Sequence, residues 1–195
     1  MKKKQLEMML ERLEGFRRPS FQMEQYATPA SVAAEMLFLA AMRGELGTVC
    51  DLGCGTGVLA IGAALLGARS IGVEIDSEAL AIARRNAKRL SADVDFIRAD
   101  VRSLLLTGID TVVMNPPFGA QKASLGDRAF LSCAQKIAKT VYSLHNQGSE
   151  GFVRSFMKPC TVQEIYRIPF PLKRCFDFHG QDVKVIGVEL YRITC

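Results

Sequence analysis

The chain alternates between short apolar runs and longer stretches whose apolar residues recur at helical spacing. The apolar runs predict strands at 48–52, 70–74, 94–99, 111–114 and 140–144. The amphipathic stretches predict helices at 29–43, 58–66, 78–90, 128–139 and 150–157. Two further strands, near 162–168 and 183–193, follow without a helix between them. This order predicts an α/β fold with a seven-stranded, mostly parallel sheet, an antiparallel closing strand and helices on both faces.

About 45 residues precede the first predicted strand. Their apolar spacing predicts a helix at 5–14, and residues 15–28 have no regular pattern. We expect Thr28 to cap the helix that Pro29 opens. No repeat or low-complexity linker divides the chain. We therefore expect a single domain, residues 1–195, in which residues 1–45 form an N-terminal extension.

Composition narrows the possible classes of protein. The chain has 195 residues, of which 49% are hydrophobic, enough for one well-packed core. Its net charge of +5 permits a polyanionic partner without requiring one. Six cysteines without a CxxC pair indicate reduced thiols in a cytoplasmic protein, and two histidines do not favour a zinc or other metal site. No apolar run is long enough to suggest a signal peptide or membrane span.

Candidate binding residues follow the first three predicted strands of the alternating pattern. The loop Asp51-Leu-Gly-Cys-Gly-Thr-Gly57 ends the first, Glu74 the second and Asp100 the third. Ligands of such sheets bind beyond the carboxyl ends of the strands, where glycines allow the backbone to approach closely. Glu74 can accept hydrogen bonds from ribose hydroxyls, and Asp100 can meet an adenine amino group. The pattern predicts an adenosyl ligand, either a nicotinamide dinucleotide or S-adenosyl-L-methionine.

The fourth strand runs into Asn115-Pro-Pro-Phe-Gly119, a rigid corner with an amide and an aromatic ring at its tip. The Asn115 side chain and the Pro116 carbonyl can accept hydrogen bonds from an adenine amino group, while Phe118 stacks on an extruded base. Such preorganised acceptors stabilise the positive charge that develops on a methylated nitrogen. The corner therefore favours methyl transfer over hydride transfer, with a plain proline turn as the structural alternative.

Several motifs carry a family resemblance. "DLGCGTG", "GVEID", "RADV" and "NPPFG" resemble class I S-adenosylmethionine-dependent methyltransferases that modify amino groups, which have a Rossmann-like fold. "MEQYATP" and "VYSLH" are similar to the small methyltransferase-like family that makes N6-methyladenosine in small-subunit ribosomal RNA, with archaeal and eukaryotic members. The resemblance runs from about Met23 to the C-terminus.

This resemblance and the motifs together imply the site residues. The expected catalytic residues are Asn115, Pro116, Pro117 and Phe118. The residues expected to bind S-adenosyl-L-methionine, with the N-terminal extension contributing, are Gln25, Tyr26, Thr28, Asp51, Gly53, Cys54, Gly55, Thr56, Gly57, Val58, Glu74, Ile75, Asp100, Val101 and Asn115.

The resemblance also implies partners. It suggests an RNA substrate and a small zinc-binding activator subunit. The third strand, 94–99, should lie at one end of the sheet, where an apolar edge is a liability unless another chain covers it.

Other functions remain open at this stage. The same chemistry would suit a DNA adenine-N6 methyltransferase or a protein glutamine-N5 methyltransferase. A non-catalytic RNA-binding subunit with this fold would not require an intact "NPPF" motif. A nicotinamide oxidoreductase would leave that motif unexplained.

Overall fold

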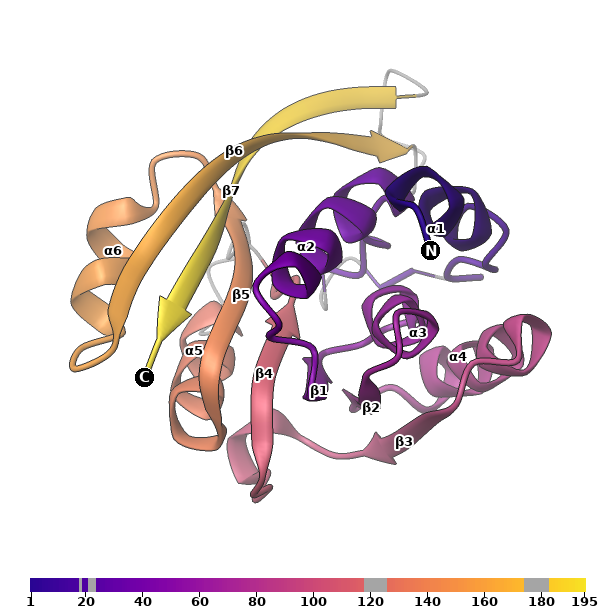
Figure 1. Ribbon diagram of the computed structural model, residues 1–195, viewed down its shortest axis with the longest axis horizontal. Helices are drawn as coiled ribbons and strands as arrows, with labels where there is room; N and C mark the ends of the chain where they lie inside the picture. The colour runs from indigo at the N-terminus through magenta and orange to yellow at the C-terminus, as the bar shows by residue number, and fades with distance from the viewer. Residues whose placement is uncertain (18, 21–23, 118–125, 174–182) are drawn as a thin grey trace.

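The sheet has seven strands. A computed structural model describes residues 1–17, 19–20, 24–117, 126–173 and 183–195, and its strands lie in the order β3-β2-β1-β4-β5-β7-β6 (Figure 1). Strands β1 to β5 run parallel, and β7 is antiparallel to both of its neighbours. The predicted fold class is confirmed. The strands are β1 (Thr48–Leu52), β2 (Arg69–Glu74), β3 (Val94–Arg98), β4 (Ile109–Met114), β5 (Ala138–Asn146), β6 (Thr161–Lys173) and β7 (Val183–Thr194).

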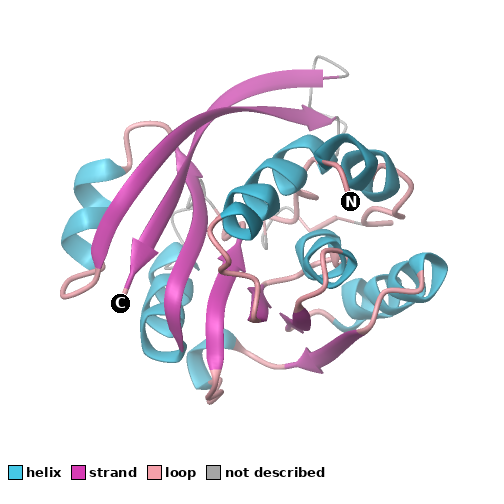
Figure 2. Ribbon diagram, in the orientation of Figure 1, coloured by secondary structure: helices cyan, strands magenta, loops and turns pink. Residues whose placement is uncertain are grey.

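Helices cover both faces of the sheet (Figure 2). One core cluster contains buried side chains of α1 to α4, and a second, on the other face, contains those of α5 and α6. Within the described part of the chain, no helix has both the length and the apolar character needed to cross a membrane. The helices are α1 (Lys3–Leu10), α2 (Ala30–Met42), α3 (Val58–Leu65), α4 (Ser77–Leu90), the 3-10 turn η1 (Val101–Ser103), α5 (Gly126–Ile137) and α6 (Glu150–Phe156).

Three local predictions are wrong because a distant partner or a neighbouring element decides the structure. Helix α1 ends at Leu10 instead of residue 14, and the Glu14 N–H donates to the side chain of Asn86, 2.9 Å away. The N-cap of α2 is Pro29, and no side chain caps this helix. The Thr28 hydroxyl instead accepts a hydrogen bond from the side chain of Asn115, the residue after β4. Helix α5 ends at Ile137, because the next residue already pairs with β4.

The hairpin of β6 and β7 is longer than predicted. It curves over α2 and brings buried side chains of both strands onto that helix (Figure 1). Phe170 of β6 and Leu190 of β7 belong to the same buried cluster as Leu37 of α2. The antiparallel end of the sheet therefore covers the helix that leads into β1.

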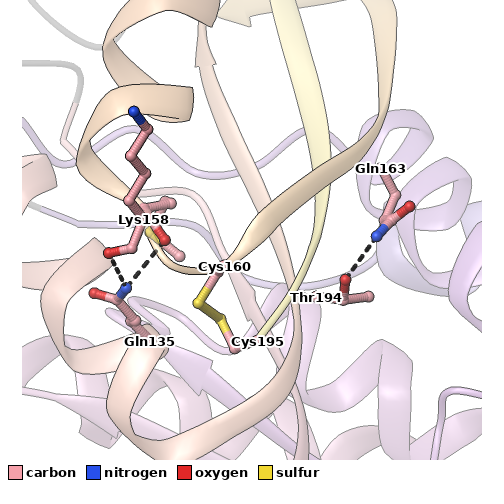
Figure 3. Close-up of a disulfide and its surroundings, with 7 residues drawn as sticks. Gln135, Lys158, Cys160, Gln163, Thr194 and Cys195 are labelled. Carbon is pink, nitrogen blue, oxygen red and sulfur yellow. Dashed lines mark hydrogen bonds between the residues drawn. A yellow bond between two sulfur atoms is a disulfide. The ribbon is translucent and has the colours of Figure 1, made fainter.

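A disulfide joins Cys160 to Cys195, which contradicts the prediction that all six thiols are reduced (Figure 3). The pairing of β6 with β7 places Thr161 opposite Thr194, so the cysteines that flank these two residues become neighbours with Cα atoms 4.2 Å apart. A separation of 35 residues hides this proximity in the sequence. Other described cysteines, at positions 50, 54 and 133, are free and buried.

Reducing this disulfide should destabilise the fold. Cross-links that close loops of 15 to 100 residues contribute roughly 3 to 4.7 kcal/mol in the chain-entropy model, and this loop lies within that range. We expect reductant to lower the free energy of unfolding by about that amount in urea titrations. Cys195→Ser should show the lower value without reductant and no further response to it. An unchanged free energy for that variant would contradict the prediction.

Candidate functional site

A cavity of about 460 Å³ lies at the carboxyl ends of β1, β2 and β4. The structure brings most of the predicted site residues together around it. Gly57 and Pro116 are not among the lining residues, and Phe118 lies outside the described residues. The predicted residues that line the cavity are Gln25, Tyr26, Thr28, Asp51, Gly53, Cys54, Gly55, Thr56, Val58, Glu74, Ile75, Asp100, Val101, Asn115 and Pro117.

Two glycines of the loop between β1 and α3 allow aromatic rings to approach the backbone. Gly53 and Gly55 have φ values of +71° and +53°, which favour glycine. A Cβ on Gly53 would lie 2.7 Å from Cε1 of Phe130, and one on Gly55 would lie 2.8 Å from Cζ of Phe16. Both rings line the cavity. Any larger residue at these positions would displace a ring from the cavity wall.

Glu74 fixes the glycine loop against the end of β2. One carboxylate oxygen accepts a hydrogen bond from the Gly55 N–H at 2.9 Å. The other accepts from the N–H groups of Ile75 and Asp76, at 2.8 and 3.0 Å. A carboxylate offers about four acceptor positions, so these three bonds leave room for one more donor. Glu74 is therefore held rigidly in the cavity wall and can still receive a ligand hydroxyl.

Asp51 lies beneath the loop and is only 1% exposed. Its Oδ2 accepts a hydrogen bond from the Ala60 N–H at 2.9 Å. Burial raises the pKa of this carboxyl to about 8, and the nearby charge of Glu74 adds to the rise. Asp51 is consequently protonated for the most part at neutral pH while the cavity holds no cation.

Asp100 follows β3 and forms an ion pair with Arg102. Arg102 donates from its main-chain N–H and from its guanidinium to this carboxylate, and those hydrogen bonds lower the pKa of Asp100 to about 2. Arg102 also lines the cavity, although it is largely exposed. Asp100 is therefore ionised under all ordinary conditions and acts only as an acceptor.

Asn115 lies at the end of β4 and carries an unused acceptor. Its Nδ2 donates to the Thr28 hydroxyl at 3.2 Å. Its Oδ1 is buried and has no hydrogen-bond partner, alone in this respect among the side chains that the structure describes. A buried acceptor without a partner costs about 1–3 kcal/mol, so such a group in a native protein calls for an explanation, and a role in binding or catalysis is one. Asn115 is thus oriented by Thr28, and its Oδ1 lacks a hydrogen-bond donor, which a ligand can supply.

Gln25 fastens the segment before α2 to the start of α4. Its Nε2 donates to Asp76 at 2.7 Å, and its Oε1 accepts from the Ser20 N–H at 2.8 Å. Ten further lining residues were not predicted. Four of them, Glu24, Ala27, Val73 and Ala99, lie within the quoted motifs but were not singled out. The other six are Phe16, Leu59, Arg102, Gly126, Ala129 and Phe130.

The raised pKa of Asp51 predicts a specific dependence of stability on pH. The folded state holds this proton up to about pH 8, whereas the unfolded chain releases it near pH 3.8. The contribution of Asp51 is therefore fully present below pH 3.8 and is lost as the pH rises toward 8. Asp51→Asn removes this titration and can keep the bond to Ala60. The difference in unfolding free energy, parent minus variant, should fall by an amount on the order of a few kcal/mol across this window. A difference that stays constant would contradict the prediction.

Comparison with known proteins places the chain in a family. A family model described as "Methyltransferase small domain" matches residues 31–157. The rRNA N(6)-adenosine-methyltransferase METTL5 of Danio rerio is 35% identical over 100% of this chain and 99% of that protein. Mettl5 of Drosophila melanogaster, with the same enzyme name, is 34% identical over 98% of this chain and 96% of that protein.

A solved structure agrees with these matches. The crystal structure of PH1948 from Pyrococcus horikoshii, named as a proposed RNA methyltransferase, has a TM-score of 0.91 and 36% identity, covering 100% of this chain and 98% of that one. The chain therefore belongs to the family of small-domain methyltransferases, and its methyl donor is S-adenosyl-L-methionine.

Proposed function

We propose that the protein methylates the N6 amino group of an adenosine in RNA, and that this RNA is small-subunit ribosomal RNA. The names of the fly and zebrafish relatives support the reaction, since this chain matches nearly their whole length. The observation that carries the proposal is the unpaired, buried Oδ1 of Asn115 at the cavity. An amino group is the kind of donor that this acceptor lacks.

The residues that line the cavity fit the methyl donor. S-adenosyl-L-methionine, when bound, supplies a methyl group on a positively charged sulfonium. Glu74, with one acceptor position left, would accept from one ribose hydroxyl, and the ionised Asp100 would accept from the adenine amino group. The close approach of Phe16 and Phe130 to the glycine loop supplies apolar walls.

The corner after β4 would hold the target base. Asn115 Oδ1 and the Pro116 carbonyl would accept from the two hydrogens of the N6 amino group. Phe118 would stack on the base. The N6 lone pair would then form a bond to the methyl carbon as the carbon–sulfur bond breaks, which would leave S-adenosylhomocysteine. The positively charged nitrogen afterwards releases a proton to solvent, so no general base is needed.

An activator subunit is the second part of this proposal. Among the described strands, β3 pairs only with β2 and forms one end of the sheet. None of its side chains is fully buried, and Asp95 and Arg98 are exposed. The segment after η1 packs Leu104 and Leu106 against the same core cluster as Ile97 of β3, and Leu105 between them is 94% exposed. A small zinc-binding protein could add a strand to this edge and cover Leu105. The proposal includes a cytoplasmic location, which is consistent with an rRNA substrate.

Asn115→Ala tests the reaction. The variant loses one preorganised acceptor at the developing charge, which typically lowers the rate about 100- to 1,000-fold. Single-turnover assays with deproteinised ribosomal RNA, read as N6-methyladenosine by nucleoside mass spectrometry, should show this loss with donor affinity little changed. Asn146→Ala, at the exposed end of β5, is the matched control. A folded Asn115→Ala that methylates RNA within threefold of the parent would overturn the mechanism. Methylation of a DNA oligonucleotide or a glutamine peptide in preference to RNA would overturn the substrate.

Leu105→Asp tests the partner surface. A charge at this residue should weaken co-purification with the zinc-binding activator at least tenfold, because a carboxylate buried in the proposed interface without a partner is costly. Met42→Asp changes another exposed apolar residue, 81% exposed at the end of α2, and should leave binding intact. Equal behaviour of the two variants would argue against the β3 edge as the binding surface.

A further inference from the structure

Asn86 of α4 is buried and joins two irregular segments. It is 1% exposed, and its Oδ1 accepts a hydrogen bond from the Glu14 N–H at 2.9 Å. Its Nδ2 donates to the carbonyl oxygens of Glu14 and Thr56, each at 2.9 Å. The amide therefore uses its oxygen and both of its N–H groups on main-chain atoms. These hydrogen bonds fix the main chain at Glu14 and Thr56, and they do not depend on the side chains of those two residues.

Both segments that Asn86 joins form part of the cavity wall. Thr56 belongs to the glycine loop and lines the cavity. Residues 11–17 follow α1 and carry Phe16, whose ring lies against Gly55 and also lines the cavity. Asn86 does not line the cavity itself. It lies behind the wall and holds two parts of it together.

The other polar contacts between this segment and α4 are weak. Arg85 reaches the Glu14 carboxylate at 3.5 Å, with about half of the Arg85 side chain exposed. Arg17 pairs with the same carboxylate within the segment. Exposed pairs of this kind contribute little. The main-chain bonds to Asn86 are consequently the principal polar link between residues 11–17 and the rest of the site.

We infer that Asn86 is a positioning residue for donor binding. By holding Glu14 and Thr56 it keeps the Phe16 ring on Gly55, so that the aromatic wall is in place before the donor arrives. This inference rests on the proposed donor site. Asn115 is oriented by Thr28 and by the end of β4, and among the described residues neither of these forms a hydrogen bond with Asn86. Loss of the Asn86 hydrogen bonds should therefore weaken binding of the methyl donor and leave the rate of methyl transfer unchanged.

Asn86→Ala is the direct test. Two hydrogen bonds to residue 14 are lost, and a wall that is in place only part of the time lowers apparent affinity by that fraction. We expect the dissociation constant of S-adenosylhomocysteine, measured by calorimetry, to rise about 10- to 30-fold. The KM for the donor should rise similarly, while kcat at saturating donor and the KM for RNA stay within twofold to threefold.

Two controls separate the main-chain link from its surroundings. Glu14→Ala removes the side chain that pairs with Arg17 and Arg85 but keeps the main-chain atoms that Asn86 binds. Arg85→Ala removes the neighbouring ion pair from α4. Both variants should bind S-adenosylhomocysteine within threefold of the parent. If either matches Asn86→Ala, side-chain pairing holds the segment and the inference is wrong.

Hydrogen exchange gives a readout that does not depend on variants that fold poorly. In the parent protein, S-adenosylhomocysteine should slow amide exchange at Glu14, because a bound donor stabilises the closed wall. Asn86→Asp, which would turn a carboxylate oxygen toward the carbonyl oxygens of Glu14 and Thr56, should show faster exchange there and a loss of affinity at least as large as that of Asn86→Ala. No slowing at Glu14 in the parent would overturn the inference.

Glu74→Ala distinguishes failure of this inference from failure of the donor site. If Glu74→Ala weakens binding of S-adenosylhomocysteine at least tenfold and Asn86→Ala does not, the proposed donor site is supported and the inference about Asn86 is wrong. If neither variant weakens binding, the cavity is not the donor site and the proposal fails with it.

Discussion

The hydrogen bond from the Gly55 N–H to the Glu74 carboxylate ties the loop after β1 to the end of β2. The rest of the site depends on this bond. Because β1 and β2 are parallel neighbours, the loop and the carboxylate reach the same edge of the sheet, and the left-handed backbone at Gly55 turns its N–H toward that edge. The loop in turn determines where Phe16 and Phe130 can lie. Together with the hydrogen bonds that the Gly53 and Cys54 N–H groups donate to the Val73 carbonyl, this contact sets the shape of one cavity wall.

Buried amides hold the irregular segments around this site. Asn86 joins residue 14 to the loop, Gln25 joins the segment before α2 to Asp76, and Asn115 bonds to Thr28. An amide offers both donors and an acceptor, so one side chain can satisfy several main-chain groups that no helix or strand supplies. These residues replace regular hydrogen bonding where the chain has left its helices and strands.

The sequence predicted the sheet and most of the cavity because both depend on local patterns. Strand and helix periods, the glycine loop and the acidic residues at strand ends are all visible within short windows. The errors arise where a distant residue decides the outcome. Thr28 reads locally as a helix cap but bonds to Asn115, and the helix expected to reach residue 14 ends early, with Glu14 bonded to Asn86. The disulfide and the aromatic wall residues likewise depend on contacts made only in the folded chain.

The placement of β7 has a consequence for how the protein folds. It follows β6 in the sequence yet lies between β5 and β6 in the sheet. During synthesis, β5 therefore presents an unpaired edge until β7 emerges, and β6 has no strand to join before then. Unpaired edges promote association with other chains, and non-local pairing is slow. The first five strands can assemble early, whereas the antiparallel end forms only after β7 inserts. A nascent chain that stalls before β7 would therefore expose the β5 edge beside β4.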